Sequence, residues 1–520
     1  MLHIKSCDEY NKIGNLHFRS GRRKKAMECY LKALSLNPNF YSAYNNIGML
    51  LNDNGDYSNA MVYLKKAITL KPDNIYHLYN MAHSLESIGD IAQSIQYLEK
   101  IIQIQPDFQK AHSTFLSELN YTLDPIENIY QKHVNWGKQV ESKIVPITNH
   151  HSDKRSDRIL RVGYLSPNFN KHSIIFFFEP LLSHHNRQHV FTVCYSNSNL
   201  IDAYTKRLKS HAHLWRDCHQ LDDESLAHLI QSDKIDILVD LAGHTINNRL
   251  LLFARKPAPI QVTYLGYVNT TGLSQMDYRI VDHWTDPVDS VNLHTEKLVR
   301  LPNTFLCYRP PDSSPPVVKA PLTRNHHVTF GSFNAGKKIS DNTILLWSKI
   351  LHAVPSSRFY IKGKSFNHKP TQALFLKKFQ ANGINSDRLI FKGFELSNTD
   401  HLAQYHHIDI GLDTYPYNGT TTTCEAFWMG VPVITLYGDR HVARVGASLL
   451  QSIGLKELIA FSEADYIQKA VSIAQDTAFI IQLRKNLRSM MVHSVLCDAP
   501  AFAQTMENAY REMWYRYCGS

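Results

Sequence analysis

The chain has 520 residues, of which 43% are hydrophobic and 20% are charged, and its formal net charge is +10. This length exceeds one ordinary hydrophobic core and predicts about three domains, while the composition is that of a soluble globular protein. The positive charges are spread along the chain, with only short basic runs, which argues against a nucleic-acid-binding protein.

The first residues and the cysteines bear on location and metal binding. The opening segment, MLHIKSCDEYNK, lacks the apolar stretch of a signal peptide. No segment reaches the roughly 20 apolar residues that span a bilayer. Eight scattered cysteines form no CxxC pair, and the histidine-rich segment 211–219 has no second cluster at metal-ligand spacing. We therefore expect a cytoplasmic protein with reduced thiols, no membrane segment and no metal.

The first part of the chain repeats with a period of 34 residues. Three glycines and three prolines keep this spacing: Gly21, Gly55, Gly89, Pro38, Pro72 and Pro106. Glycine turns the chain between two helices, and proline ends the second helix. The pattern resembles tetratricopeptide repeats, with three full copies from about residue 7 to 108 and a partial fourth from 109. Such arrays present a concave surface, so we expect protein or peptide partners.

Two series of short β-branched segments follow, and each alternates with helical segments. The first series includes ILRVGYLS, FTVCYS and IDILVDLAG, and the second includes VTFGSFN, RFYIKG and IDIGLDT. This alternation predicts two parallel α/β sheets covered by helices on both faces. We expect repeats over 1–122, a helical linker over 123–157, and Rossmann-like halves over 158–318 and 326–520, the second with the nucleotide site. Ligands of such sheets bind where strands end and helices begin.

The segment NGTTTTCEAFWMG follows a predicted strand and opens a predicted helix. Its entrance consists of Asn418, Gly419, Thr420, Thr421, Thr422 and Thr423. Unpaired N–H groups and about half a positive charge at such an end favour an anion, and threonine hydroxyls add donors. Thr422 and Glu425 also fit a capping box, which would satisfy these donors internally. A capping box uses one threonine, however, and does not explain four.

Other candidates lie at further strand ends. The segment GSFNAGKKIS, which begins at Gly331, places two lysines where they could neutralise a diphosphate, and an ordinary surface pair is the alternative. His172 in SPNFNKHS and His244 in DLAGHT follow strands of the first half. Either imidazole could act as a base or orient a hydroxyl near neutral pH. A histidine that is merely solvated is the alternative in both cases.

Taken together, these segments resemble the O-linked N-acetylglucosamine transferases, specifically their SPINDLY-like branch. The resemblance runs from about residue 10 to 515 and includes GYLSPNFNKHS, FARKPAPIQVTYLGY, NGTTTTCEAFWMGVPVITL and GDRHVARVGASLL. It implies a GT-B glycosyltransferase preceded by helical repeats. It further implies inverting transfer of N-acetylglucosamine from UDP-N-acetylglucosamine to protein serine or threonine hydroxyls, with neither a metal nor another cofactor.

The resemblance also assigns roles to individual positions. Lys338 would bind the donor diphosphate, Glu425 would engage the ribose and His401 would pack on the base. His172 would be the base or would position the acceptor. The full set of expected donor-binding residues is Asn334, Lys338, His401, Asn418, Gly419, Thr420, Thr421, Thr422, Thr423 and Glu425, with Leu265 and Gly266 as a wall beside the sugar. The expected catalytic residues are His172, Lys338 and His244.

Three departures from the family pattern bear on the identity of the donor. Ala335 and Gly336 stand where an amide-bearing residue is usual, Val268 and Asn269 replace Pro-Gly, and Ser173 replaces a proline. A GDP-fucose or UDP-hexose donor is therefore one alternative. A repeat-based scaffold with weak catalysis is the other. The sequence leaves the oligomeric state open.

Overall fold

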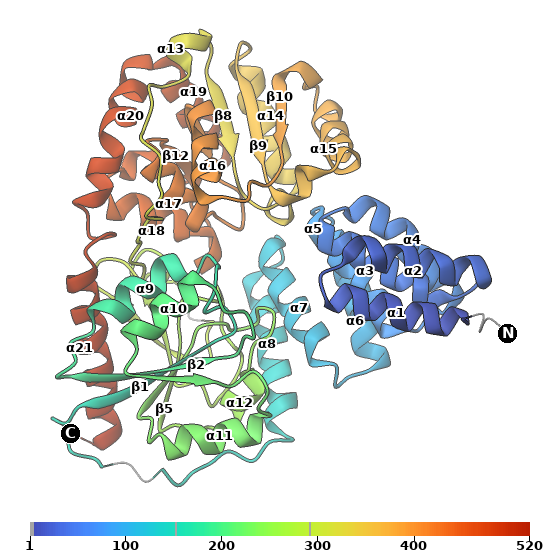
Figure 1. Ribbon diagram of the computed structural model, residues 1–520. Helices are drawn as coiled ribbons and strands as arrows, with labels where there is room; N and C mark the ends of the chain where they lie inside the picture. Colours follow the sequence, from blue (N-terminus) through green and yellow to red (C-terminus); the bar gives the residue numbers. More distant parts are fainter. Residues whose placement is uncertain (1–4, 151–152, 291–292, 520) are drawn as a thin grey trace. The chain divides into compact units, whose positions relative to one another are not determined.

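The structure, a computed structural model, describes residues 5–150, 153–290 and 293–519 (Figure 1). Contacts divide the chain into two compact units. The first unit comprises residues up to 122 together with 331–395, and the second comprises 123–330 and 396 onward. No helix in the described part of the chain combines the length and hydropathy that a membrane crossing requires.

The first unit begins with three helix pairs and a seventh helix, which Figure 1 draws in blue to cyan. They are α1 (Cys7–Arg19), α2 (Arg23–Leu36), α3 (Tyr41–Asn54), α4 (Tyr57–Leu70), α5 (Ile75–Ser87), α6 (Ile91–Ile104) and α7 (Gln109–Glu118). The repeated glycines Gly21, Gly55 and Gly89 turn the chain within each pair, with φ of 72°, 83° and 82°. Glycine adopts this left-handed conformation without strain. Each repeated proline lies two residues beyond the second helix of its pair.

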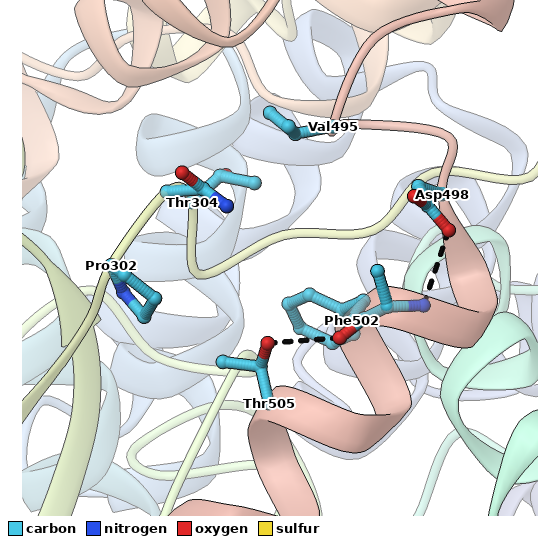
Figure 2. A pocket seen from close by; sticks show the side chains of 8 residues that line it. Pro302, Thr304, Val495, Asp498, Phe502 and Thr505 are labelled. Carbon is cyan, nitrogen blue, oxygen red and sulfur yellow. Dashed lines mark hydrogen bonds between the residues drawn. The ribbon is translucent and has the colours of Figure 1, made fainter.

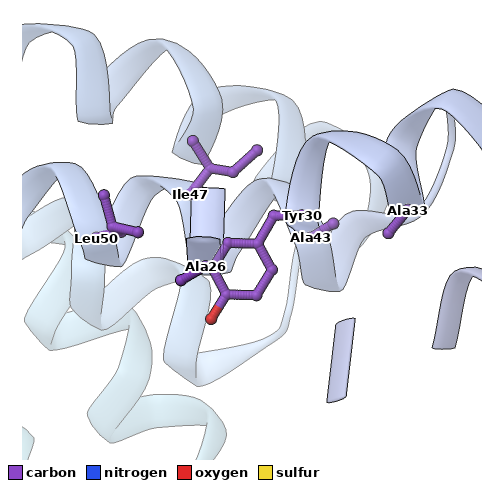
Figure 3. Packing of buried hydrophobic residues seen from close by; sticks show 6 residues of the cluster. All are labelled: Ala26, Tyr30, Ala33, Ala43, Ile47 and Leu50. Carbon is purple, nitrogen blue, oxygen red and sulfur yellow. The ribbon is translucent and has the colours of Figure 1, made fainter. Parts of the chain in front are cut away.

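Small residues let the paired helices cross closely. A Cβ atom on Gly14 of α1 would lie 2.4 Å from Cε1 of Tyr30 in α2, so a larger residue there would displace the ring. The buried cluster of the first repeats consists of Ala26, Tyr30, Ala33, Ala43, Ile47 and Leu50 (Figure 3). This alternation of alanine with large side chains confirms the predicted helical repeats.

The first unit also contains part of the second α/β segment. Its elements are α14 (Asp341–Ala353), β9 (Arg358–Lys362), α15 (Lys369–Ala381), β10 (Leu389–Lys392) and the one-turn helices η2 (Gly336–Lys338), η3 (Lys364–Asn367) and η4 (Ser386–Arg388). Strands β9 and β10 are parallel, with Phe359 opposite Leu389. The side chain of Ser365 donates a hydrogen bond to the carbonyl of Ser87 at 2.9 Å, which ties this segment to the repeats.

The second unit contains a sheet of seven strands in the order β3-β2-β1-β4-β5-β6-β7. The strands are β1 (Leu160–Ser166), β2 (Val190–Ser196), β3 (Leu214–Asp217), β4 (Ile237–Asp240), β5 (Ile260–Thr263), β6 (Tyr278–Asp282) and β7 (Lys297–Leu301). All their pairings are parallel. The accompanying helices are α8 (Ile126–Glu141), α9 (Ile175–His184), α10 (Ala203–His211), α11 (Asp223–Ser232) and α12 (Leu250–Ala254).

A second sheet has six strands in the order β10-β9-β8-β11-β12-β13. Its remaining strands are β8 (Thr329–Ser332), β11 (Ile410–Leu412), β12 (Val433–Leu436) and β13 (Ile459–Ala460). The later helices are α13 (Leu322–Asn325), α16 (Asn398–Ala403), α17 (Thr421–Trp428), α18 (Val445–Ser452), α19 (Glu463–Gln475), α20 (Thr477–Val492) and α21 (Ala499–Cys518). These two parallel sheets after the repeats confirm the predicted fold class.

The last helix, α21, returns to the first sheet. It packs against α9, and Glu507 accepts a hydrogen bond from Nδ1 of His185 at 2.9 Å. The sequence-based bounds placed this helix in the second half, and β8 belongs partly to each compact unit. The domain bounds therefore stay a prediction, since the chain crosses between the sheets twice.

The carboxyl group of Glu118, at the end of α7, is buried at the end of the repeats. Oγ of Ser94 lies 2.9 Å from the carbonyl of Ala82 and 2.8 Å from Oε1 of Glu118. One hydroxyl hydrogen serves only one of these oxygens, so a protonated Glu118 that donates to Ser94 satisfies both contacts. Burial and the charge of Glu86 raise the pKa of Glu118 to about 9, in agreement with this arrangement.

We predict that Glu118→Gln stabilises the protein increasingly as pH rises from 5 to 8. Over this range the unfolded chain releases the Glu118 proton and the folded chain keeps it, so wild-type stability falls with pH. The glutamine amide donates to Ser94 without this cost. The stability difference should grow by on the order of 1–2 kcal/mol, measured by urea unfolding at both pH values. An unchanged difference would contradict a protonated Glu118.

Candidate functional site

The predicted helix entrance is present in the second unit. Strand β11 ends at Leu412, and α17 begins at Thr421, with Thr420 as the N-cap. Within the described chain the side chain of Thr420 makes no capping hydrogen bond. The capping box considered from the sequence is wrong, because Thr422 lies inside the helix and not at its cap. The N-cap side chain therefore does not compete with an anion at the start of α17.

The loop before α17 is fixed by a buried carboxylate. Oδ1 of Asp413 accepts hydrogen bonds from the backbone N–H of Thr414 at 2.9 Å and of Gly419 at 2.6 Å. Its Oδ2 accepts a third from the hydroxyl of Thr435 at 2.8 Å. Asn418 braces the same loop, since its Nδ2 donates to the carbonyl of Thr414 at 2.9 Å. Asn418 and Gly419 thus shape the entrance of α17.

Two predicted donor residues meet beside this helix. Nε2 of His401 lies 2.9 Å from Oε2 of Glu425, and the hydroxyl of Tyr405 lies 3.3 Å from the same oxygen and 3.0 Å from the carbonyl oxygen of Thr422. The ring of Tyr405 stands edge-on to that of His401, with 6.2 Å between centroids. These contacts fix the orientation of the imidazole. No local sequence pattern indicates Tyr405, whose contact depends on how the turn after α16 packs.

His172 occupies the loop between β1 and α9. Its Nδ1 accepts a hydrogen bond from the backbone N–H of Ile174 at 3.2 Å. The neutral ring therefore carries its hydrogen on Nε2. Although the residue reaches solvent, surrounding protein lowers its pKa through desolvation, which favours this neutral form. Next to it, Nζ of Lys171 donates to the carbonyl of Leu396 at 2.9 Å and steadies the loop.

His244 is buried and does not lie on an open loop. Its Nε2 bonds to the carbonyl of Thr271 at 2.9 Å, and its ring centroid lies 4.5 Å from that of Trp136 in α8. The prediction that His244 faces a cleft is wrong, because α8 covers the loop after β4. Gly266 packs on the carbonyl of Leu241 in the same region, and Leu265 beside it has a φ of 69°. These residues form a packed wall.

Asn334 and Lys338 lie in the first unit, in the segment after β8. Asn334 is buried, and its Nδ2 donates to the hydroxyl of Ser332 at 3.3 Å. Lys338 is half-buried at the end of η2. The neighbouring Lys337 forms an ion pair with Glu86 of the repeats at 2.7 Å. The sequence suggested that either lysine could neutralise a diphosphate. The ion pair with Glu86 occupies Lys337, so the two lysines have different environments.

Asp240 is a further carboxyl group that the sequence analysis did not single out. It ends β4, is buried, and accepts hydrogen bonds from the backbone N–H of Ala242 at 3.0 Å and of Gly243 at 2.8 Å. Burial raises its pKa to about 6, although these hydrogen bonds oppose the shift. Its position at the end of the predicted strand IDILVD could have identified it as a candidate from the sequence.

A small pocket elsewhere in the second unit lies at the start of α21 (Figure 2). Oδ1 of Asp498 accepts from the backbone N–H of Ala501 at 3.1 Å, and Thr505 donates to the carbonyl of Ala501 at 2.8 Å. Asp498 thereby caps this helix with negative charge, which disfavours a phosphate there. None of the expected site residues lines the pocket.

Comparison with protein families gives matches over most of the chain. The model of glycosyl transferase family 41 matches residues 111–309 and 321–506. Tetratricopeptide-repeat models match residues 7–40, 41–74 and 78–108. The first of these matches covers more than half of the chain, and the others coincide with the helix pairs of the first unit.

Curated relatives and a solved structure agree with these matches. The probable UDP-N-acetylglucosamine–peptide N-acetylglucosaminyltransferases SPINDLY of Solanum lycopersicum and Arabidopsis thaliana are 41% and 40% identical over 417 residues, 79% of this chain. The chain spans about 45% of the length of these relatives. A lysine-to-methionine mutant of the Thermobaculum terrenum O-GlcNAc transferase matches with a TM-score of 0.92 and 33% identity, over 99% of this chain and 98% of that one. The chain belongs to glycosyl transferase family 41.

Proposed function

We propose that the protein is an inverting glycosyltransferase that transfers N-acetylglucosamine from UDP-N-acetylglucosamine to serine or threonine hydroxyls of proteins. The observation that carries this proposal is the uncapped entrance of α17, with its threonines beside the His401–Glu425 pair. An anion site next to an oriented imidazole suits a nucleoside diphosphate. The printed names of the curated relatives favour the same donor.

The chemistry requires stabilisation of the departing diphosphate. The acceptor oxygen bonds to the anomeric carbon, the bond from that carbon to the diphosphate oxygen breaks, and its electron pair leaves with UDP. We propose that the start of α17, with the hydroxyls of Thr421 and Thr422, stabilises this charge without a metal ion. The family resemblance assigns Lys338 to the diphosphate as well. Preorganised donors of this kind typically lower a barrier by about 3 kcal/mol each.

His172 suits a positioning role in this scheme. With Nδ1 held by the N–H of Ile174, its Nε2–H can donate to an oxygen of the acceptor or of the sugar. Removal of the acceptor proton by Nε2 would require the other tautomer, which would break the contact with Ile174. We therefore propose that His172 orients the reactants. A group other than His172 then accepts the proton of the acceptor hydroxyl.

The repeats suit peptide binding through a row of asparagines. Nδ2 of Asn46 donates to Oδ1 of Asn11 at 2.8 Å and of Asn15 at 3.0 Å. Nδ2 of Asn80 donates to Oδ1 of Asn45 at 2.9 Å. These half-buried side chains lie on α1, α3 and α5, the first helix of each pair. Because each amide offers both a donor and an acceptor, such a row matches the backbone of an extended peptide acceptor.

The donor and the activity are tested together with the purified chain. We expect UDP-N-acetylglucosamine to raise the melting temperature most among UDP-N-acetylglucosamine, UDP-hexoses and GDP-fucose, and to support transfer to an acceptor protein. Transfer only from GDP-fucose or a UDP-hexose would establish the alternative donor. Binding of peptides with no cleavage of any donor would instead establish a repeat-based scaffold.

Lys338→Ala should lower kcat at least about 100-fold, because it removes the cation that we assign to the diphosphate. The matched control is Lys349→Ala, which removes an exposed lysine of α14 and should leave kcat unchanged. Circular dichroism and melting temperature should match the wild type in both variants. Near-normal turnover of Lys338→Ala would exclude the assigned role.

His172→Gln and His172→Ala separate positioning from base catalysis. Glutamine keeps an N–H donor and has no basicity, so the positioning role predicts at least about tenfold more activity for the glutamine variant than for the alanine variant. Transfer is measured at pH 7.5 with saturating donor. Equal loss in both variants would favour His172 as the base.

A further inference from the structure

The loop that carries Lys338 is anchored to the third repeat by a partly buried ion pair, in which the Lys337 side chain is 35% exposed. Nζ of Lys337 lies 2.7 Å from Oε1 of Glu86, near the end of α5. The Glu86 side chain is only 13% exposed. Nζ of Lys337 also lies 5.3 Å from the ring centroid of Tyr121. This pair lies within the first unit and joins residues 251 positions apart in the sequence.

The charges in this cluster support one another. Burial raises the pKa of Glu86, but the ammonium of Lys337 and hydrogen bonds from His83 and Lys337 lower it to about 2. Burial lowers the pKa of Lys337, but the charge of Glu86 and hydrogen bonds to Glu86 and Tyr121 raise it well above its ordinary value. Both partners are therefore ionised at neutral pH. Removing one alone leaves a buried charge without its partner, which is costly.

Backbone contacts fix the loop beside the ion pair. A Cβ atom on Gly89 would lie 3.0 Å from the carbonyl oxygen of Gly336 and 3.3 Å from that of Ile339. A Cβ atom on Gly336 would lie 2.9 Å from the carbonyl oxygen of Ser87. The turn after α5 and the turn of η2 thus pack backbone against backbone. Only glycine permits this approach on each side.

The geometry of η2 relates its two lysines. A 3₁₀-helix has three residues per turn, so successive side chains point about 120° apart. With Lys337 fixed on Glu86 and the turn fixed on Gly89, the direction of Lys338 is determined as well. A change in the Lys337–Glu86 pair would remove one of the two anchors of this turn, which is only three residues long.

We propose that Glu86 is a positioning residue that acts through Lys337 to direct Lys338 toward the donor diphosphate. This inference rests on the proposed function. Under this proposal the C-terminal end of α5, through Glu86, supports the donor site. Asn80 of the same helix belongs to the asparagine row. The third repeat therefore serves donor binding in addition to acceptor binding.

The test measures UDP affinity of the full chain by titration calorimetry, in a double-mutant cycle. We expect Glu86→Gln to weaken UDP binding about tenfold and to lower kcat, with the KM for the acceptor unchanged. In a Lys338→Ala background, Glu86→Gln should weaken UDP binding no further, because its effect passes through Lys338. Equal weakening in both backgrounds, or no weakening in either, would overturn the inference.

Two further variants separate positioning from general destabilisation. Asp53→Asn breaks an ion pair with Arg23 in the preceding repeats and should leave UDP affinity unchanged. The exchanged pair Glu86→Lys with Lys337→Glu restores opposite charges and should recover most of the affinity lost in Glu86→Gln. An exchanged pair that folds but binds UDP no better than Glu86→Gln would also count against the inference. A wild-type chain without any transfer would instead refute the proposed function.

Discussion

The start of α17, where the N-cap residue Thr420 makes no side-chain capping hydrogen bond, is the feature on which the account of the site depends. A helix entrance binds an anion only if its donors are not satisfied internally. Here the loop carboxylate, Asp413, engages the N–H of Gly419 ahead of the helix, and the side chain of Thr420 does not cap the first turn. The uncharged hydroxyls add donors without adding a competing negative charge. Thr422 and Glu425 would form a capping box only if Thr422 were the N-cap. The N-cap is Thr420, so they do not.

The site also depends on supports that lie far away in the sequence. Glu425 and Tyr405 hold the edge of His401, and the third repeat holds the turn that carries Lys338. In each case the residue expected to touch the donor is fixed by a neighbouring side chain or turn. Such supports reduce the conformational freedom that is lost on binding, which is how preorganised sites gain affinity.

The sequence predicted the repeats and the helix entrance because both depend on local patterns. Glycines 34 residues apart define the helix pairs, and the threonine run marks the start of α17. The partners of Lys337 and His244 depend on tertiary packing instead. Glu86 lies 251 residues before Lys337, and Trp136 of α8 covers His244 from a helix that the sequence assigned to a linker. No local pattern distinguishes a buried loop histidine from an exposed one.

Titration of UDP into chelator-treated protein tests the central claim most directly. If helix dipole, hydroxyls and an ammonium bind the diphosphate, calorimetry should give the same affinity in EDTA as in excess manganese or magnesium. An affinity that disappears in EDTA and returns when the divalent ion is restored would contradict this account.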